Sequence, residues 1–312
     1  MQTFSEILHF LGASLIHKPG LLCRSYGLTL LDPHTWKHDD HERDLSIQWA
    51  EFIRMDHEAQ ELFKHCGFRL GILAESVFEN WLQKQNIDYR RGLQIFESKP
   101  VSRTLGELDF LYKRNQEWQH FELAAKIYCF RPQNNDFIGP NKRDFFHRKL
   151  NTLKTQQLPL VSHPCAISTL QSEGLKNVKQ SSVHFCGRLF YPPGEWKTPD
   201  YVNPSHSKGI YFEKHLPLQN FKNNNVLLLL PRYLWFLPEI VLDQMISVKF
   251  TKGNFAELQW ANLANTVQTE QLKNVIDHFK SIGKTTMLSL LEFKASKWFE
   301  TERILLLPHT LN

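Results

Sequence analysis

Hydrophobic residues between residues 70 and 85 recur at the three- and four-residue spacing of a helix. Leu73, Val77 and Trp81 form one row, and the residues that follow each of them form a second apolar row beside it. An apolar stripe of this width predicts an amphipathic helix that packs one face against a core. Glu75 lies beside this stripe.

The pattern then changes to the alternation of polar and apolar residues that is typical of strands. Residues 89–96, 105–112 and 118–128 predict three strands, and the short turns between them favour antiparallel neighbours. Residues 143–155 return to helical spacing with a basic outer face, and residues 182–191 predict a fourth strand. The sequence therefore predicts an α/β (α+β) fold in which helices flank a mixed central sheet.

Residues 67–194 hold this predicted core, and the segments outside it differ in character. Residues 1–66 carry apolar positions at helical spacing and predict a helical N-terminal region. Residues 195–225 are rich in Pro, Asn, Ser and His, so we interpret them as a linker. Residues 226–312 predict a C-terminal α+β region of strands with one or two helices, of which residues 270–280 are the clearest.

The composition of the 312 residues argues against several classes of protein. A hydrophobic fraction of 42% and a charged fraction of 22% are typical of a globular protein. Five scattered cysteines without a CxxC pair argue against a disulfide scaffold and a structural zinc site. The apolar segments are too short or too broken to span a bilayer, so we expect a cytoplasmic protein without a membrane partner. The net charge of +5 permits a nucleic-acid partner but does not demand one.

Acidic residues and one lysine gather on two consecutive predicted strands. Glu107 and Asp109 occupy alternate positions of the second strand, so we expect their side chains on one face and their apolar neighbours in the core. Glu122 and Lys126 likewise share one face of the third strand. If the two polar faces coincide, three carboxylates and a lysine converge on one side of a hairpin.

Such a cluster is costly unless a cation joins it, because buried carboxylates without partners are unfavourable. Mg²⁺ prefers a few carboxylate oxygens together with waters and substrate phosphate, and it can polarise a phosphodiester and activate a water. A nearby lysine can orient that water or offset the charge of the transition state. A solvated face with cross-strand Glu–Lys pairs is the alternative interpretation.

The order of helix, three strands, helix and strand, with a Gly-Glu-x-Asp sequence at residues 106–109, resembles the PD-(D/E)xK nuclease superfamily. The resemblance extends over residues 68–191 and implies a restriction-endonuclease-like core. It also implies that Asp109 and Glu122 are metal ligands and that Lys126 is the catalytic lysine.

At the level of the whole chain, the sequence also resembles an uncharacterised bacterial family, domain-of-unknown-function family 1853, which is assigned to that superfamily. The supporting stretches are Arg43-Asp44-Leu45, Arg69-Leu70-Gly71, residues 106–111, residues 120–128, Ile138-Gly139-Pro140-Asn141 and residues 187–192. The superfamily resemblance further makes Glu75 similar to a catalytic glutamate that some members carry on the helix. Glu107 is expected to support the metal. The family implies no established activity.

The third strand departs from the acid-x-Lys motif that is usual in the superfamily. Glu122 and Lys126 are four residues apart, and Ala124 stands in the usual acidic place. At ~3.3 Å per residue, Glu122 lies ~6.6 Å further along the strand than the motif allows. The length of the glutamate or a β-bulge can recover part of this gap. Otherwise the second ligand is Glu75 or Glu107, or the site has decayed.

The basic face of the helix predicted at residues 143–155 is a candidate surface for nucleic acid. Its members are Lys142, Arg143, Arg148 and Lys149. We expect these side chains to contact phosphates, although an ordinary solvated helix face explains them equally well. His120 is close to the acidic residues in sequence, and we interpret it as a surface residue that points away from Glu122.

Taken together, these features predict an Mg²⁺-dependent endo- or exodeoxyribonuclease, with Mn²⁺ as an alternative metal, DNA as the partner and a homodimer as one open option. A catalytically decayed nuclease fold that binds nucleic acid is the first alternative. A protein-interaction module is the second, with the C-terminal region supplying an interface through residues such as Trp235 and Trp260.

Overall fold

The structure, a computed structural model, describes residues 69–97, 103–114, 116–178, 180–203, 206–213, 216, 225–230, 232, 235–236, 241–242, 246–250, 256–260, 284–295 and 297–308. The helical region predicted at residues 1–66 and the helix predicted at residues 270–280 lie outside the described residues.

The helical segments are α4 (Leu70–Lys84), a 3₁₀ turn (Pro132–Asn134), α5 (Phe146–Thr152), a π-helical turn (Leu153–Gln157), α6 (Leu158–Leu160) and α7 (Pro164–Ser172). The first six strands are β1 (Tyr89–Glu97), β2 (Arg103–Arg114), β3 (Glu117–Arg131), β4 (Asp136–Ile138), β5 (Gln180–Tyr191) and β6 (Lys208–Phe212). The others are β7 (Asn225–Leu230), β8 (Val241–Leu242), β9 (Ile246–Phe250), β10 (Ala256–Trp260), β11 (Thr286–Lys294) and β12 (Lys297–Leu306). None of the helices in this part of the chain is long and apolar enough to cross a membrane.

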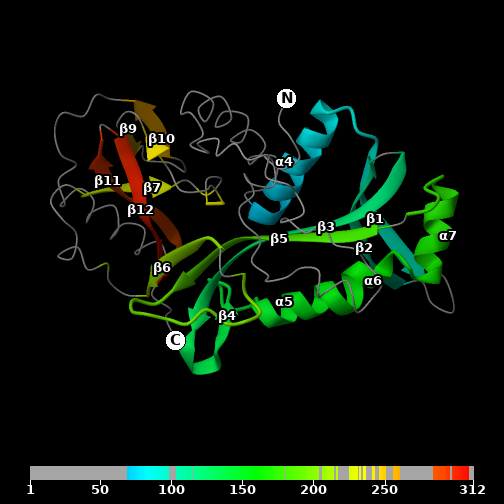
Figure 1. The fold of residues 1–312 in the computed structure, drawn as a ribbon, viewed down its shortest axis with the longest axis horizontal. Coiled ribbons are helices and arrows are strands. Elements are labelled where there is room, and N and C mark those ends of the chain that lie inside the picture. The colour runs from blue at the N-terminus through cyan, green and yellow to red at the C-terminus, as the bar shows by residue number, and fades with distance from the viewer. Residues whose placement is uncertain are drawn as a thin grey trace.

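The described strands form one ten-stranded mixed sheet and a separate ladder of β9 with β10. The main order is β1-β2-β3-β5-β6-β12-β11-β7, with β4 beside β3 and β8 beside β12. β1, β2 and β3 are antiparallel neighbours, as the short turns predict. β3 and β5 are parallel, because α5, α6 and α7 form the crossover that carries the chain back. Figure 1 shows α4 on one side of these strands and α5 and α6 on the other. The predicted mixed sheet flanked by helices is confirmed.

The hydrophobic core fills both faces of the sheet around β3. On the α4 face, Phe78 contacts Phe110 and Phe121, with ring centroids 4.9 and 4.8 Å away. On the α5 face, Tyr128 contacts Phe146, with ring centroids 5.4 Å apart. The strand is therefore buried on both faces, as is usual where a parallel neighbour and crossover helices cover it. The amphipathic helix predicted at residues 70–85 is confirmed by α4, whose apolar rows face this core.

One core is shared across the segment that the sequence marks as a linker. β6 lies within residues 195–225 and pairs in parallel with both β5 and β12. The cluster that contains Phe78 also contains Tyr211, Met287 and Leu305. The predicted domain boundaries stay a prediction, but strands from both sides of residues 195–225, among them β5 and β12, belong to one sheet.

Candidate active site

The ladder between β2 and β3 opens at one end, and two carboxylates stand where it opens. Antiparallel pairing ends at Phe110↔Phe121. Asp109 and Glu122 are the next residues on the two strands, which places them opposite each other at the point of separation. Like charges in this relation are destabilising unless something offsets them. We call this place the β2–β3 fork.

Side chains take over the hydrogen bonds that the ladder no longer makes at the fork. The backbone amide of Leu123 donates to Asp109 Oδ2 at 3.0 Å, and the backbone amide of Asp109 donates to Glu122 Oε1 at 3.3 Å. Backbone donors in a protein interior need such partners. The two carboxylates therefore lie between the separated strands and accept hydrogen bonds from backbone amides that the ladder leaves unpaired.

The charge on this carboxylate pair is unfavourable. Burial and the neighbouring carboxylate of Glu122 raise the pKa of Asp109 from 3.8 to about 8, and the bond from Leu123 opposes this rise only in part. Burial also raises the pKa of Glu107, with smaller contributions from the carboxylates of Glu75 and Glu122. A perturbed acid beside a second acid is typical of functional sites.

Glu122 is fully buried between two polar partners. Its Oε1 lies 2.7 Å from His120 Nε2, and its Oε2 accepts a hydrogen bond from Gln157 Nε2 at 2.8 Å. His120 Nδ1 in turn lies 2.9 Å from Ser181 Oγ on β5. The interpretation of His120 as a surface residue turned away from Glu122 is wrong, because residues 120 and 122 share strand parity and the crossover buries that face.

Lys126 lies on the same strand but is held by a different carboxylate. Its Nζ donates to Asp144 Oδ2 at 2.6 Å, and Tyr128 Oη donates to the other oxygen of Asp144 at 3.2 Å. The register of β3 with β5 runs without interruption from Gln119 to Cys129, so no bulge shortens the interval between Glu122 and Lys126. The four-residue spacing therefore persists at full strand length.

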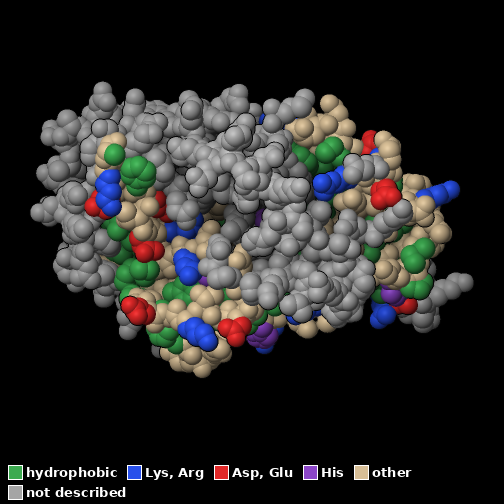
Figure 2. All heavy atoms as spheres, in the orientation of Figure 1, with side chains coloured by type: hydrophobic (Ala, Val, Ile, Leu, Met, Phe, Trp, Pro, Cys, Tyr) green, Lys and Arg blue, Asp and Glu red, His purple; other side chains and the backbone are tan. Residues whose placement is uncertain are grey.

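The four predicted phosphate-binding residues divide into two groups. Lys142, Arg143 and Arg148 are exposed, and the Arg148 guanidinium lies over the ring of Phe145, 4.4 Å from its centroid. Lys149 is half-buried and turns toward the fork, where its Nζ donates to Gln157 Oε1 at 2.7 Å. On the face shown in Figure 2, basic and acidic side chains of the described residues are intermixed rather than gathered by sign.

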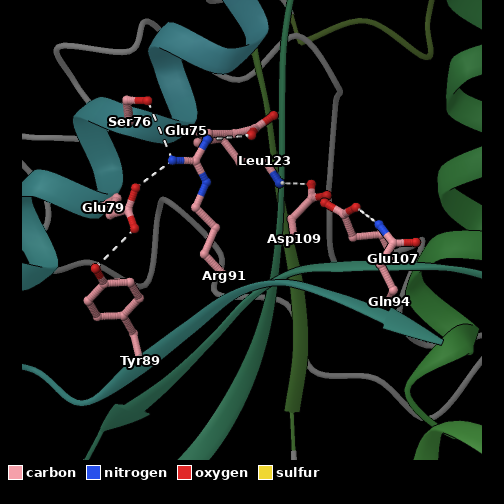
Figure 3. A network of polar contacts seen from close by, with 9 residues as sticks. All are labelled: Glu75, Ser76, Glu79, Tyr89, Arg91, Gln94, Glu107, Asp109 and Leu123. Atoms are coloured by element: carbon pink, nitrogen blue, oxygen red, sulfur yellow. Dashed lines mark hydrogen bonds and ion pairs between the residues drawn. The ribbon is translucent and has the colours of Figure 1, made fainter. Parts of the chain in front are cut away.

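Glu75 lies on the α4 side of the fork and is paired with a cation. Arg91 of β1 bonds Glu75 at 2.9 Å and also bonds Glu79, which ties the strand to α4. Figure 3 shows Arg91 between the two glutamates, while Asp109 and Glu107 lie beyond Glu75 and Glu107 bonds Gln94. Glu75 and Glu107 therefore border the fork, while Asp109 and Glu122 form their hydrogen bonds with other residues.

The apolar residues of β2 on either side of Asp109 pack into different parts of the core. Leu108 and Phe110, the apolar neighbours of Asp109, are both buried but belong to different clusters: Leu108 packs with Leu160 near α7, and Phe110 packs with Phe78. Gly92, on β1 beside this point, has a φ of +67°, a left-handed conformation that favours glycine. Simple alternation therefore does not hold along β2 at the fork, whereas it continues along β3.

Two of the residues that contact the predicted site are not found by sequence reasoning. Asp144 precedes α5, and Gln157 ends the π-helical turn, far from the acidic strands in sequence. Only the parallel crossover brings Gln157 to Glu122 and Asp144 to Lys126. In the part of the chain that the structure describes, no group of three or more His, Cys, Asp and Glu side chains is arranged to hold a metal ion.

Comparisons with known proteins identify a family but no characterised relative. Neither the curated proteins nor the solved structures contain a match to this chain. One family model, described as a domain of unknown function (DUF1853), matches residues 13–307. Since the match covers most of the sequence, the chain belongs to the DUF1853 family.

Proposed function

We propose that the protein is a divalent-metal-dependent hydrolase of phosphodiester bonds in DNA, built on a PD-(D/E)xK-type core. The observation that carries this proposal is the Asp109–Glu122 pair at the β2–β3 fork, in which burial and mutual repulsion raise the pKa of Asp109 to about 8. A cation between the two carboxylates would relieve that repulsion. The order α4, β1, β2, β3, α5, β5 supports the assignment of the core.

The donor set fits magnesium with two protein carboxylates. Mg²⁺ is commonly bound by one or two carboxylates, with waters and substrate phosphate completing an octahedron. Asp109 and Glu122 would be those ligands, and Glu107 would hold an outer water. The bound ion would polarise the phosphate and make a water more acidic. Mn²⁺ has similar preferences for oxygen and would replace it.

The remaining groups of the site supply positive charge and position. Positive charge favours the ionised form of Asp109, so the pair gives up its proton when the site is loaded. The arginine of the Arg91–Glu75 pair brings fixed charge close to the fork, and Lys126, oriented by Asp144, holds its charge four residues further along β3. Charges that are already positioned where a phosphate becomes more negative lower the barrier without reorganisation. His120 holds Glu122 in one orientation.

A cleavage screen tests this proposal. Supercoiled, linear duplex and single-stranded DNA, with RNA for comparison, are incubated with Mg²⁺ or Mn²⁺. We expect cleavage of DNA by the wild type and a loss of ~100-fold or more in Asp109→Asn and Glu122→Gln, as for removal of a main electrostatic contributor. Lys154→Met, on the π-helical turn, is the control. Cleavage that persists in both carboxylate variants would exclude the assignment.

A second function is favoured by one specific observation. Glu122 is fully buried and bonded by His120 and Gln157, and Lys126 is bonded by Asp144, so both groups have partners within the protein. A protein that binds nucleic acid on this scaffold without cutting it agrees with these contacts. It predicts binding that weakens as salt rises, with no product under Mg²⁺ or Mn²⁺. Any metal-dependent product that the carboxylate variants abolish would exclude this alternative.

A further inference from the structure

Lys149 reaches the carboxylate pair from the helix rather than from the strands. Its Nζ donates to Gln157 Oε1 at 2.7 Å, and Gln157 Nε2 donates to Glu122 Oε2 at 2.8 Å. One amide side chain thus connects the ammonium to the carboxylate. Burial lowers the pKa of Lys149, while the carboxylates of Asp109 and Glu122 favour its charged form, which places its charge within their field.

The geometry of α5 explains why this lysine differs from the basic residues before it. Lys149 lies on α5 and Gln157 lies eight residues later, at the end of the π-helical turn. A π-turn widens the helix locally and changes which side chains face inward. Leu153 and Leu158 remain fully buried on the sheet, while the polar Gln157 faces Glu122 between them.

Lys126 forms its ion pair with a different residue. Its ammonium bonds Asp144, and Asp144 is further bonded by Tyr128. The positive charge of Lys126 is thereby paired with a carboxylate outside the fork. Lys149 donates to a neutral amide instead, and among the charged groups around it the carboxylates of Asp109 and Glu122 do most to favour its charged form.

We propose that Lys149 is the cation that serves the carboxylates of the β2–β3 fork, and that Gln157 positions its ammonium group. In the metal-free protein its ammonium offsets the charge of the Asp109–Glu122 pair. When a divalent cation offsets the charge of the carboxylates instead, the ammonium would be available to bind a phosphate oxygen of the substrate. This second role rests on the proposed function; the first role does not.

The first role is tested by thermal unfolding without metal. Lys149→Met, Glu122→Gln and the double variant are compared in the full chain. We expect the two substitutions to be non-additive: Lys149→Met lowers the midpoint in the wild type and lowers it clearly less in Glu122→Gln, because the negative charge that it offset is gone. Lys126→Met in the Glu122→Gln background is the control and is expected to be additive.

The same comparison with Asp109→Asn in place of Glu122→Gln guards against a variant that does not fold. Additive effects of Lys149→Met in both backgrounds would overturn the first role. This result would not depend on whether the protein cleaves anything, so it is separate from a failure of the proposed function.

The second role is tested by combining Mn²⁺ titration with cleavage. Lys149→Met removes a charge that competes with the metal, so the affinity of the variant for Mn²⁺ should rise by about tenfold or more, as expected when a unit charge that one amide side chain separates from the site is removed. Its cleavage rate should nevertheless fall by about tenfold or more, because a phosphate contact is lost. Lys154→Met should change neither. Unchanged Mn²⁺ affinity, or cleavage at the wild-type rate, would overturn the inference.

Discussion

At the scale of single residues, the site depends on one pair of carboxylates. Asp109 and Glu122 face each other at the open end of a ladder, and each accepts a backbone hydrogen bond that the ladder would otherwise have satisfied. Replacing either one changes structure as well as charge. Variants that keep the acceptor and remove the charge, Asp109→Asn and Glu122→Gln, therefore separate the two roles best.

Asp109 makes stability depend on pH in a defined direction. Its pKa is about 8 in the folded protein and ~3.9 in an unfolded chain, so between these values the folded state holds a proton that the unfolded state releases. The contribution of Asp109 to the free energy of unfolding is thus fully present below about pH 4 and is lost as the pH rises through about 8.

We expect Asp109→Asn to raise the free energy of unfolding at pH 8, by roughly 2–5 kcal/mol, and to change it little near pH 4. Urea unfolding of the metal-free proteins at several pH values measures this. Asp88→Asn, at an exposed position, is the control and should change little at either pH. An Asp109→Asn variant that is less stable than the wild type at pH 8 would contradict the account of the fork.

Sequence parity found the acidic pair but not its surroundings. Glu107, Asp109, Glu122 and Lys126 could be named from alternation alone, because they lie on strands whose ends were predicted within a few residues. Alternation did not locate the fork, because this depends on which residues β2 and β3 pair with. His120 shares the strand parity of Glu122, and its burial depends on the crossover that covers that face of β3. Register between distant strands is a tertiary property that local pattern does not carry.

At the scale of elements, the contact between β3 and β5 fixes the position of the site. Gly187 on β5 lies opposite Lys126 with a φ of +132°, and a Cβ there would come within 1.7 Å of the Lys126 carbonyl oxygen. The strands approach so closely only because residue 187 has no side chain. The four core strands and both helices that carry the site were predictable from periodicity, but this close approach was not.

Gly187→Ala is expected to destabilise the protein by about 3 kcal/mol or more, because both backbone strain and a clash must be relieved by moving β3. Chemical unfolding measures the loss. Gly71→Ala on α4 is the matched control: a Cβ there meets nothing within 4 Å, and alanine favours the helix by ~1 kcal/mol. If both variants were equally stable, the tight β3–β5 contact would be wrong.

At the scale of the whole molecule, strands from before and after residues 195–225 share one sheet and one core cluster. β6 joins β5 to β12, and the cluster around Phe78 includes residues from β6, β11 and β12. Composition alone suggested a linker at residues 195–225, because the strand within it is short and its surroundings are polar. Its pairing partners are remote in sequence, which is why the segment could not be recognised as part of the sheet.

A chain that ends at residue 203 should therefore fail to form a stable monomer. Without β6 and β12, the edge of β5 and part of the core around Phe190 are left uncovered, and uncovered strand edges associate. Size-exclusion chromatography and thermal unfolding, with the full chain as the control, measure this. A monomeric fragment with a cooperative transition would show that residues 1–203 fold independently.

The central claim is that a divalent cation binds at the fork. Calorimetric titration of Mn²⁺ into the full chain tests it most directly. The account predicts one site whose affinity rises as the pH passes from 6 to 8.5, because the metal displaces the proton that Asp109 holds with a pKa of about 8. Asp109→Asn and Glu122→Gln should each weaken the site by ~10-fold or more. Binding that is unchanged in both variants, or the absence of any Mn²⁺ site in the wild type, would contradict it.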